Sequence, residues 1–140
     1  MTLLVIDGQG GKLGEQVIKA VRERFGDLEI IAVGINSSAT AAMMKSGANQ
    51  AATGENPVVA ACRRADVIIG PIGIAIADSF LGEITPKMAL AVAQSDAVRI
   101  LIPMNKCNNL VAGIHEVSMP VLIEDVIHKL SAIIKSAKID

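Results

Sequence analysis

Aromatic side chains are almost absent from this chain, whose 140 residues include two Phe and neither Trp nor Tyr. Hydrophobic residues nevertheless make up 51% of the composition. The core must therefore be built from aliphatic side chains, as is typical of buried parallel sheets. The absence of Tyr also excludes a phenolic general acid of the kind that some reductases use.

The chain also has few cysteines and a small net charge. Cys62 and Cys107 are the two cysteines and stand far apart, which is no disulfide framework and favours a reducing compartment. The net charge of −1 argues against a nucleic-acid partner. No apolar run is long enough to span a membrane, and the apolar run beginning at Leu3 leaves no room for a signal peptide. These absences predict a cytoplasmic protein without a membrane partner.

Glycine, in contrast, is concentrated directly after the first apolar run, Leu3–Ile6, and before a segment with helical periodicity, Glu15–Val21. The turn between them consists of Gly8, Gln9, Gly10, Gly11, Lys12, Leu13 and Gly14. A strand, a glycine-rich turn and a helix form the first unit of a dinucleotide-binding fold, in which the backbone and the helix N-terminus bind a pyrophosphate.

The spacing of these glycines departs from the G-x-G-x-x-G pattern, because Leu13 stands where the third glycine belongs. The alternative interpretation is a turn that only connects strand and helix. A substitution distinguishes the two: from the sequence we expect Gly11→Ala to fold with a melting midpoint near the parent and to lose ligand binding.

The second apolar strand, Leu28–Ile35, ends in polar, uncharged residues: Asn36, Ser37 and Ser38. In this fold an acid at that position binds the 2′-hydroxyl of NAD. No acid stands here, so the sequence places NADP slightly ahead of NAD. The alternative role for Ser38 is the N-cap of a helix over residues 39–46.

Two later segments also reach the edge of the sheet where open α/β folds bind ligands. The first is Gly70, Pro71, Ile72 and Gly73, which continues into an apolar stretch up to Leu81. This stretch predicts either a short helix packed against a partner subunit, and hence a homo-oligomer, or the wall of a pocket.

The second of these segments is the polar loop of residues 104–109, which includes Asn105, Lys106 and Cys107. Asn105 and its neighbours would flank the reacting ring of a bound cofactor. A catalytic Cys107 has no identifiable partner base, and a turn in which the Asn side chains bind their own backbone is the simpler interpretation. No metal-ligand spacing is present.

The alternation of strands and helices predicts one α/β domain over residues 1–140, a doubly wound, parallel, Rossmann-like sheet with strand order 3-2-1-4-5-6. The expected strands include residues 65–71, 98–102 and a short sixth strand, Leu110–Ile114. Helices are expected from Asn56–Pro57, from Thr85–Pro86 and over 121–137.

Five runs of this chain together resemble one known family. They are Val5–Gly11, Ala52–Asn56, Ala65–Ile74, Gly82–Met88 and Ile102–Asn105. The family consists of small bacterial proteins that are labelled only as a domain of unknown function and described as Rossmann-like. The resemblance implies the fold and a bacterial, cytoplasmic protein, and it implies no activity.

Two functions fit these observations. The first is a module that binds NADP or NAD and acts as a sensor or binding protein. The alternative is a small NAD(P)-dependent oxidoreductase. The module is favoured because enzymes of this fold add a substrate domain or an acid–base residue, and neither is recognisable here.

Overall fold

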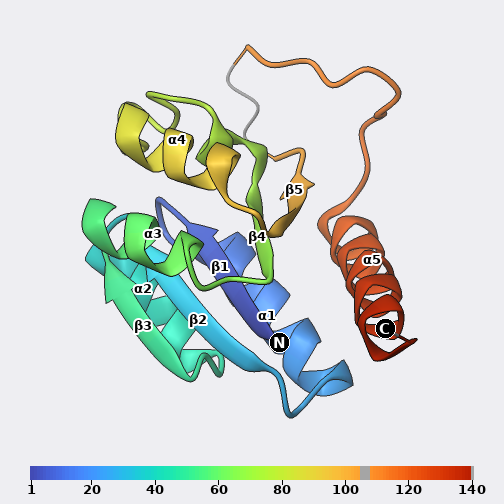
Figure 1. The fold of residues 1–140 in the computed structure, drawn as a ribbon. Coiled ribbons are helices and arrows are strands. Elements are labelled where there is room, and N and C mark those ends of the chain that lie inside the picture. The colour runs from blue at the N-terminus through green and yellow to red at the C-terminus, as the bar shows by residue number, and fades with distance from the viewer. Residues whose placement is uncertain (105–107, 140) are drawn as a thin grey trace.

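The computed structural model describes residues 1–104 and 108–139, in which strands and helices alternate from the N-terminus (Figure 1). The strands are β1 (Thr2–Asp7), β2 (Glu29–Gly34), β3 (Gln50–Thr53), β4 (Val67–Pro71) and β5 (Val98–Ile102). The helices are α1 (Lys12–Arg24), α2 (Ser37–Lys45), α3 (Glu55–Cys62), a short 3-10 helix η1 (Ile72–Ala75), α4 (Pro86–Gln94) and α5 (Met119–Ile139).

The described strands form one parallel sheet in the order β3-β2-β1-β4-β5. This confirms the single-domain α/β fold and the first five positions of the expected order. Asp7 at the end of β1 lies opposite Gly34 at the end of β2. The carboxyl ends of β1 and β2, and the loops that follow them, therefore meet at one edge of the sheet.

Helices cover both faces of the sheet, and each face buries its own aliphatic cluster (Figure 1). On one face, α1, α2 and α5 pack on side chains such as Leu3 and Val5. On the other, α3, α4 and the segment that follows β4 pack on Leu4 and Ile6. Neighbouring residues of β1 point to opposite faces, so a strand covered on both sides is a continuous apolar run.

Three details of the expected secondary structure were wrong. Residues Leu110–Ile114 form no strand; Gly113 adopts a positive φ of 82° within this segment, and the Leu110 side chain is exposed. Helix α2 begins at Ser37 rather than at residue 39. Helix α3 begins at Glu55 with Gly54 as its N-cap, so Asn56 lies inside the first turn instead of capping it.

The apolar stretch after β4 packs against the chain's own core. Ile74 and Phe80 are buried in the same cluster as α3 and α4, whereas Leu81 is fully exposed. A partner subunit is therefore not needed to cover Ile74 and Phe80. Self-association stays a prediction, and within this stretch it now rests on Leu81.

Candidate functional site

The glycine-rich turn lies at the point where the chain order of the sheet reverses. After β3 the chain returns past β1 to form β4, so the loops that follow β1 and β4 leave the sheet in opposite directions. Open α/β sheets bind their ligands in the crevice at this switch point. The turn Gly8–Gly11 is closed by a hydrogen bond of 3.0 Å from the Gly11 N–H to the Gly8 carbonyl. Gly11 is the N-cap of α1 and adopts the left-handed conformation, with φ 72°.

Asp7, the last residue of β1, binds the turn from its buried side. Its carboxylate is buried and accepts hydrogen bonds of 2.8 Å from the N–H groups of Gly8 and Gly14. Burial raises the pKa of Asp7 above its usual value of 3.8, and the negative charge of Glu83 acts in the same direction, whereas the backbone N–H groups of Gly14, Gly8 and Leu13 oppose the rise. The carboxylate of Asp7 thus accepts the Gly14 N–H in the first turn of α1, which is therefore not available to a ligand.

Glu83 lies on the solvent side of the same turn. Its Oε1 accepts a hydrogen bond of 3.1 Å from the Gln9 N–H, and its Oε2 accepts one of 2.8 Å from the Asn36 side chain. A Cβ at Gly8 would lie 2.9 Å from Glu83 Oε1 and 3.3 Å from the Phe80 ring. Gly8 is therefore a glycine because a carboxylate and an aromatic ring pack directly on it.

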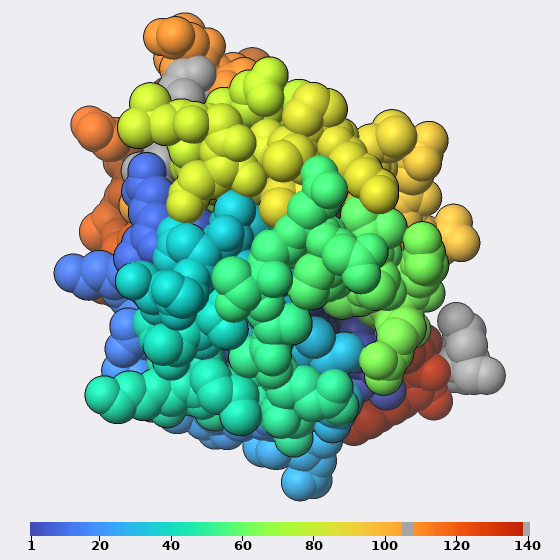
Figure 2. Space-filling view, turned by 90° about the vertical axis from the view of Figure 1, so that its left-hand side faces the viewer, coloured from blue at the N-terminus to red at the C-terminus, as the bar shows by residue number. Residues whose placement is uncertain are grey.

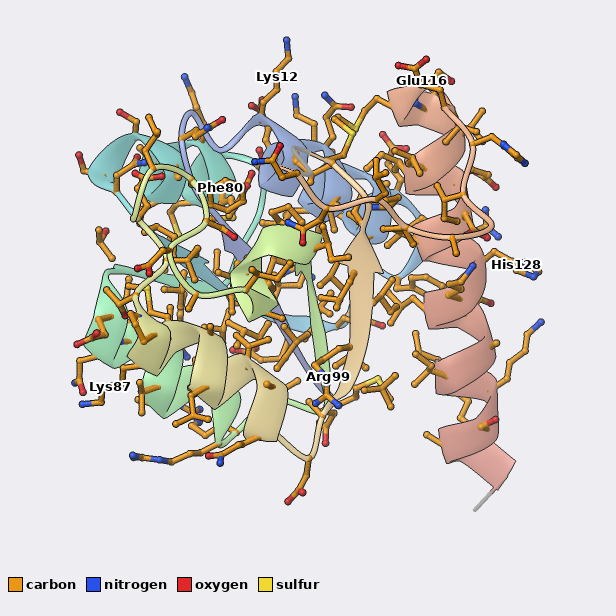
Figure 3. The ribbon with its side chains drawn as sticks, turned by 90° about the horizontal axis from the view of Figure 1, so that it is seen from above. Lys12, Phe80, Lys87, Arg99, Glu116 and His128 are labelled. Atoms are coloured by element: carbon orange, nitrogen blue, oxygen red, sulfur yellow. The ribbon has the colours of Figure 1, made fainter. Side chains whose placement is uncertain are left out.

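Two backbone N–H groups of the turn remain available for a ligand. Within the part of the chain that the structure describes, the N–H groups of Gly10 and Lys12 have no acceptor. A Cβ at Gly10 would meet no atom within 4 Å. Figure 3 shows the Lys12 side chain pointing into solvent, while Phe80 lies inside the molecule. The positive end of the α1 dipole also favours an anion at this place.

The residues after β2 take roles that differ from the expected ones. Asn36, not Ser38, is the N-cap of α2: its Oδ1 accepts the Ala39 N–H at 2.9 Å. Ser37 and Ser38 are exposed in the first turn of that helix. No acid follows β2 in the sequence, but the Glu83 carboxylate of a distant loop hydrogen-bonds to Asn36 and brings an acid to this place.

The residues predicted at the end of β4 are close to the turn but are covered. A Cβ at Gly70 would lie 2.4 Å from the Ile6 carbonyl oxygen of the neighbouring strand, and one at Gly73 would lie 3.1 Å from Phe80. Pro71 is buried and Ile72 is half-buried at the start of η1. Packing inside the chain is thus sufficient to explain both glycines. Asn105, Lys106 and Cys107 lie outside the described residues.

Sequence reasoning missed the two carboxylates that hold the turn. Asp7 directly precedes the glycines, and a buried strand that ends in an acid before a helix was a usable signal of an internal cap. Glu83 had no comparable signal, because 74 residues separate it from Gln9 and 47 separate it from Asn36. Only the packing of the loop between η1 and α4 places it on the turn.

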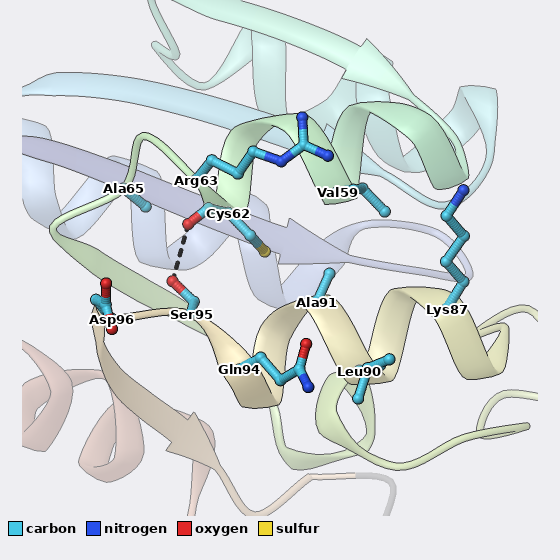
Figure 4. A pocket seen from close by; sticks show the side chains of 10 residues that line it. All are labelled: Val59, Cys62, Arg63, Ala65, Lys87, Leu90, Ala91, Gln94, Ser95 and Asp96. Atoms are coloured by element: carbon cyan, nitrogen blue, oxygen red, sulfur yellow. Dashed lines mark hydrogen bonds between the residues drawn. The ribbon is translucent and has the colours of Figure 1, made fainter.

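A separate cleft of about 480 Å³ lies between α3 and α4. Figure 2 shows these two helices side by side on one face of the molecule, and Figure 4 shows the cleft from close by. Arg63 and Lys87 contribute its cations, and the Ser95 hydroxyl donates a hydrogen bond of 2.8 Å to the Cys62 carbonyl. No residue of this cleft belongs to the turn after β1, so it is a competing location for a ligand.

The thiol of Cys62, at the floor of this cleft, is expected to be unreactive. Cys62 is 4% exposed, and burial raises the pKa of its thiol from 9.0 to about 11. The thiolate fraction near pH 8 is therefore about 100-fold lower than that of an unshifted thiol. Alkylation by iodoacetamide in a Cys107→Ser variant should be at least that much slower in the folded protein than in urea. Similar rates in the two states would contradict the burial of this thiol.

Neither a metal cluster nor a spanning helix is found in residues 1–104 and 108–139. No group of three or more His, Cys, Asp or Glu side chains among them is arranged to hold a metal ion. No helix in these two ranges is both long and apolar enough to cross a membrane.

Comparisons with known proteins identify a family and no activity. No functionally curated protein matches the chain. Among solved structures, a dodecameric FMN-dependent UbiX-like decarboxylase from Escherichia coli O157:H7 is similar over 86% of this chain and 87% of its own, with 14% identity and a TM-score of 0.37. A likeness at that TM-score carries no argument about ligand or assembly. The model of the family described as "Domain of unknown function (DUF3842)" matches residues 2–135. The chain therefore belongs to this family.

Proposed function

We propose that this chain is a nucleotide-binding module whose ligand is a nicotinamide dinucleotide, bound with its pyrophosphate over the turn Gly8–Gly11. The observation that carries the proposal is the pair of N–H groups of Gly10 and Lys12, which have no protein acceptor in the described residues and lie at the switch point of the sheet. The open space around Gly10 supports it, because a pyrophosphate needs close approach to the backbone.

A binding or sensing role is favoured over catalysis because both carboxylates at the turn are engaged. Asp7 accepts two backbone N–H groups from below, and Glu83 links Gln9 to Asn36 from above. A general acid or base must be able to reach the reacting atom of a substrate. Asp7 instead fixes the loop after β1 to the start of α1, and Glu83 joins that loop to the one after β2, so both carboxylates shape a binding surface.

An amide titration tests the location of the ligand. We expect NAD, added to the ¹⁵N-labelled protein, to shift the amide signals of Gly10 and Lys12 most, since their N–H groups would donate to the pyrophosphate. Signals of Arg63 and Lys87 in the α3–α4 cleft serve as the internal control. The proposal is wrong if the largest shifts cluster in that cleft, or if millimolar NAD and NADP shift no signal at all.

A further inference from the structure

The carboxylate of Glu83 stands between the loops that follow β1 and β2, although Glu83 belongs to neither. Oε1 accepts the N–H of Gln9 in the first loop, and Oε2 accepts the amide of Asn36 in the second. The carboxyl ends of β1 and β2 are adjacent in the sheet, so this is the place where a strand-end acid would read a ribose.

The loop that carries Glu83 is held in one conformation by its own hydrogen bonds. The Asp78 N–H donates to the Ile84 carbonyl at 2.7 Å, and the Ile84 N–H donates to the Ser79 carbonyl at 3.1 Å. Phe80 anchors the loop with a side chain that is 4% exposed. Asp78, Phe80 and Leu81 all adopt positive φ, a costly conformation that persists where surrounding contacts determine it. Glu83 is thus presented on a preorganised support.

Asn36 fixes the second side of the carboxylate. Its Oδ1 must face the Ala39 N–H that it caps, so its Nδ2 is the atom that donates to Glu83. The amide cannot turn around without losing the cap of α2. Glu83 and Asn36 together therefore form a rigid polar pair at the end of β2.

We propose that Glu83 accepts hydrogen bonds from the ribose diol of the bound dinucleotide, and that it selects an unphosphorylated 2′-hydroxyl over a 2′-phosphate. This inference rests on the function proposed above. A carboxylate has about four acceptor sites, and Gln9 and Asn36 occupy two of them. The remaining two match the two hydroxyl donors of a ribose, whereas a 2′-phosphate would bring a second anion against the carboxylate.

Glu83 leaves the anion position of the turn open. Its Oε1 lies over Gly8, 2.9 Å from where a Cβ would stand, whereas Gly10 has no neighbour within 4 Å of the same position. The ribose and pyrophosphate positions are therefore adjacent and distinct. With Glu83 in this role, we expect NAD to bind more tightly than NADP, the reverse of the order expected from the sequence.

Calorimetric titration of NAD and NADP tests the role of Glu83. The wild-type protein should bind NAD at least about tenfold more tightly than NADP, because a hydrogen bond to a charged group changes an affinity by about tenfold or more. Glu83→Gln removes the charge and keeps the size, and it should bring the two affinities to within about threefold, by weakening NAD and strengthening NADP. Asp78→Asn is the matched control, because it removes an exposed charge from the same loop and Asn tolerates positive φ. It should keep the wild-type ratio.

Three results would overturn the inference. The first is a wild-type protein that binds NADP as tightly as NAD, a measurement that does not depend on the folding of any variant. The second is an unchanged ratio in Glu83→Gln. The third is an equal change in both variants, which would assign the effect to long-range charge. If the protein binds neither dinucleotide, both the proposed function and this inference are wrong. If it binds them with a ratio that does not depend on Glu83, only this inference is wrong.

Discussion

Gly11→Ala should lower the free energy of unfolding by about 3 kcal/mol, through overpacking and the left-handed backbone that Gly11 adopts. A Cβ at Gly11 would lie 2.6 Å from Ala39 Cα and 2.9 Å from the Ala39 carbonyl oxygen, and φ there is 72°. Both contacts are backbone atoms of α2, which cannot move aside as a side chain would. In a domain of this size the melting midpoint should fall by about 10 °C.

Gly10→Ala is the matched control for this prediction. The neighbouring position has nothing within 4 Å of a Cβ, so the change should cost less than about 1 kcal/mol. Urea unfolding followed by far-UV circular dichroism measures both variants, because the chain has no Trp or Tyr to report by fluorescence. Equal stabilities for the two variants would contradict the close packing of α2 on Gly11.

This expectation replaces the one drawn from the sequence, in which Gly11→Ala was to melt near the parent. The spacing of the glycines identifies the turn but does not indicate which glycine packs against a neighbouring helix. That information lies in the contact between Gly11 and Ala39, which belong to different βα units. Gly10, rather than Gly11, is therefore the position at which ligand binding can be tested without loss of the fold.

Local signals predicted most of the fold. Aliphatic runs placed β1, β2, β4 and β5, and Thr85 with Pro86 correctly placed the start of α4, where the Thr85 hydroxyl accepts the Met88 N–H. The start of α2 was ambiguous because Asn36, Ser37 and Ser38 are all good N-caps of similar strength. In the structure Asn36 is the N-cap, and the other end of its amide donates to Glu83.

Long-range contacts account for what was missed at the candidate site. The turn and the Asn36 region were predicted from residues close together in sequence. The carboxylate that joins them comes from a loop whose conformation depends on Phe80 being buried against the sheet. Periodicity contains no information about such a contact, because neither Glu83 nor its partners change the apolar pattern.

Gly10→Val should abolish most of the stabilisation that a dinucleotide confers. Ligand at about 100 times its dissociation constant stabilises the native state by roughly 2.7 kcal/mol, which corresponds to a midpoint shift on the order of 10 °C. A valine at Gly10 would fill the open space in which the pyrophosphate approaches the backbone. The N–H groups of Gly10 and Lys12 would remain, but the ligand could not reach them.

Gly26→Val is the control for this change, because Gly26 lies beyond the other end of α1 and a Cβ there would meet its first neighbour only at 3.8 Å. The decisive measurement is the melting midpoint of wild type, Gly10→Val and Gly26→Val by far-UV circular dichroism, with and without saturating NAD. We expect similar midpoints without ligand, and a ligand-induced rise in wild type and Gly26→Val that is largely lost in Gly10→Val. A full rise in Gly10→Val, or no rise in wild type, would contradict binding at the turn.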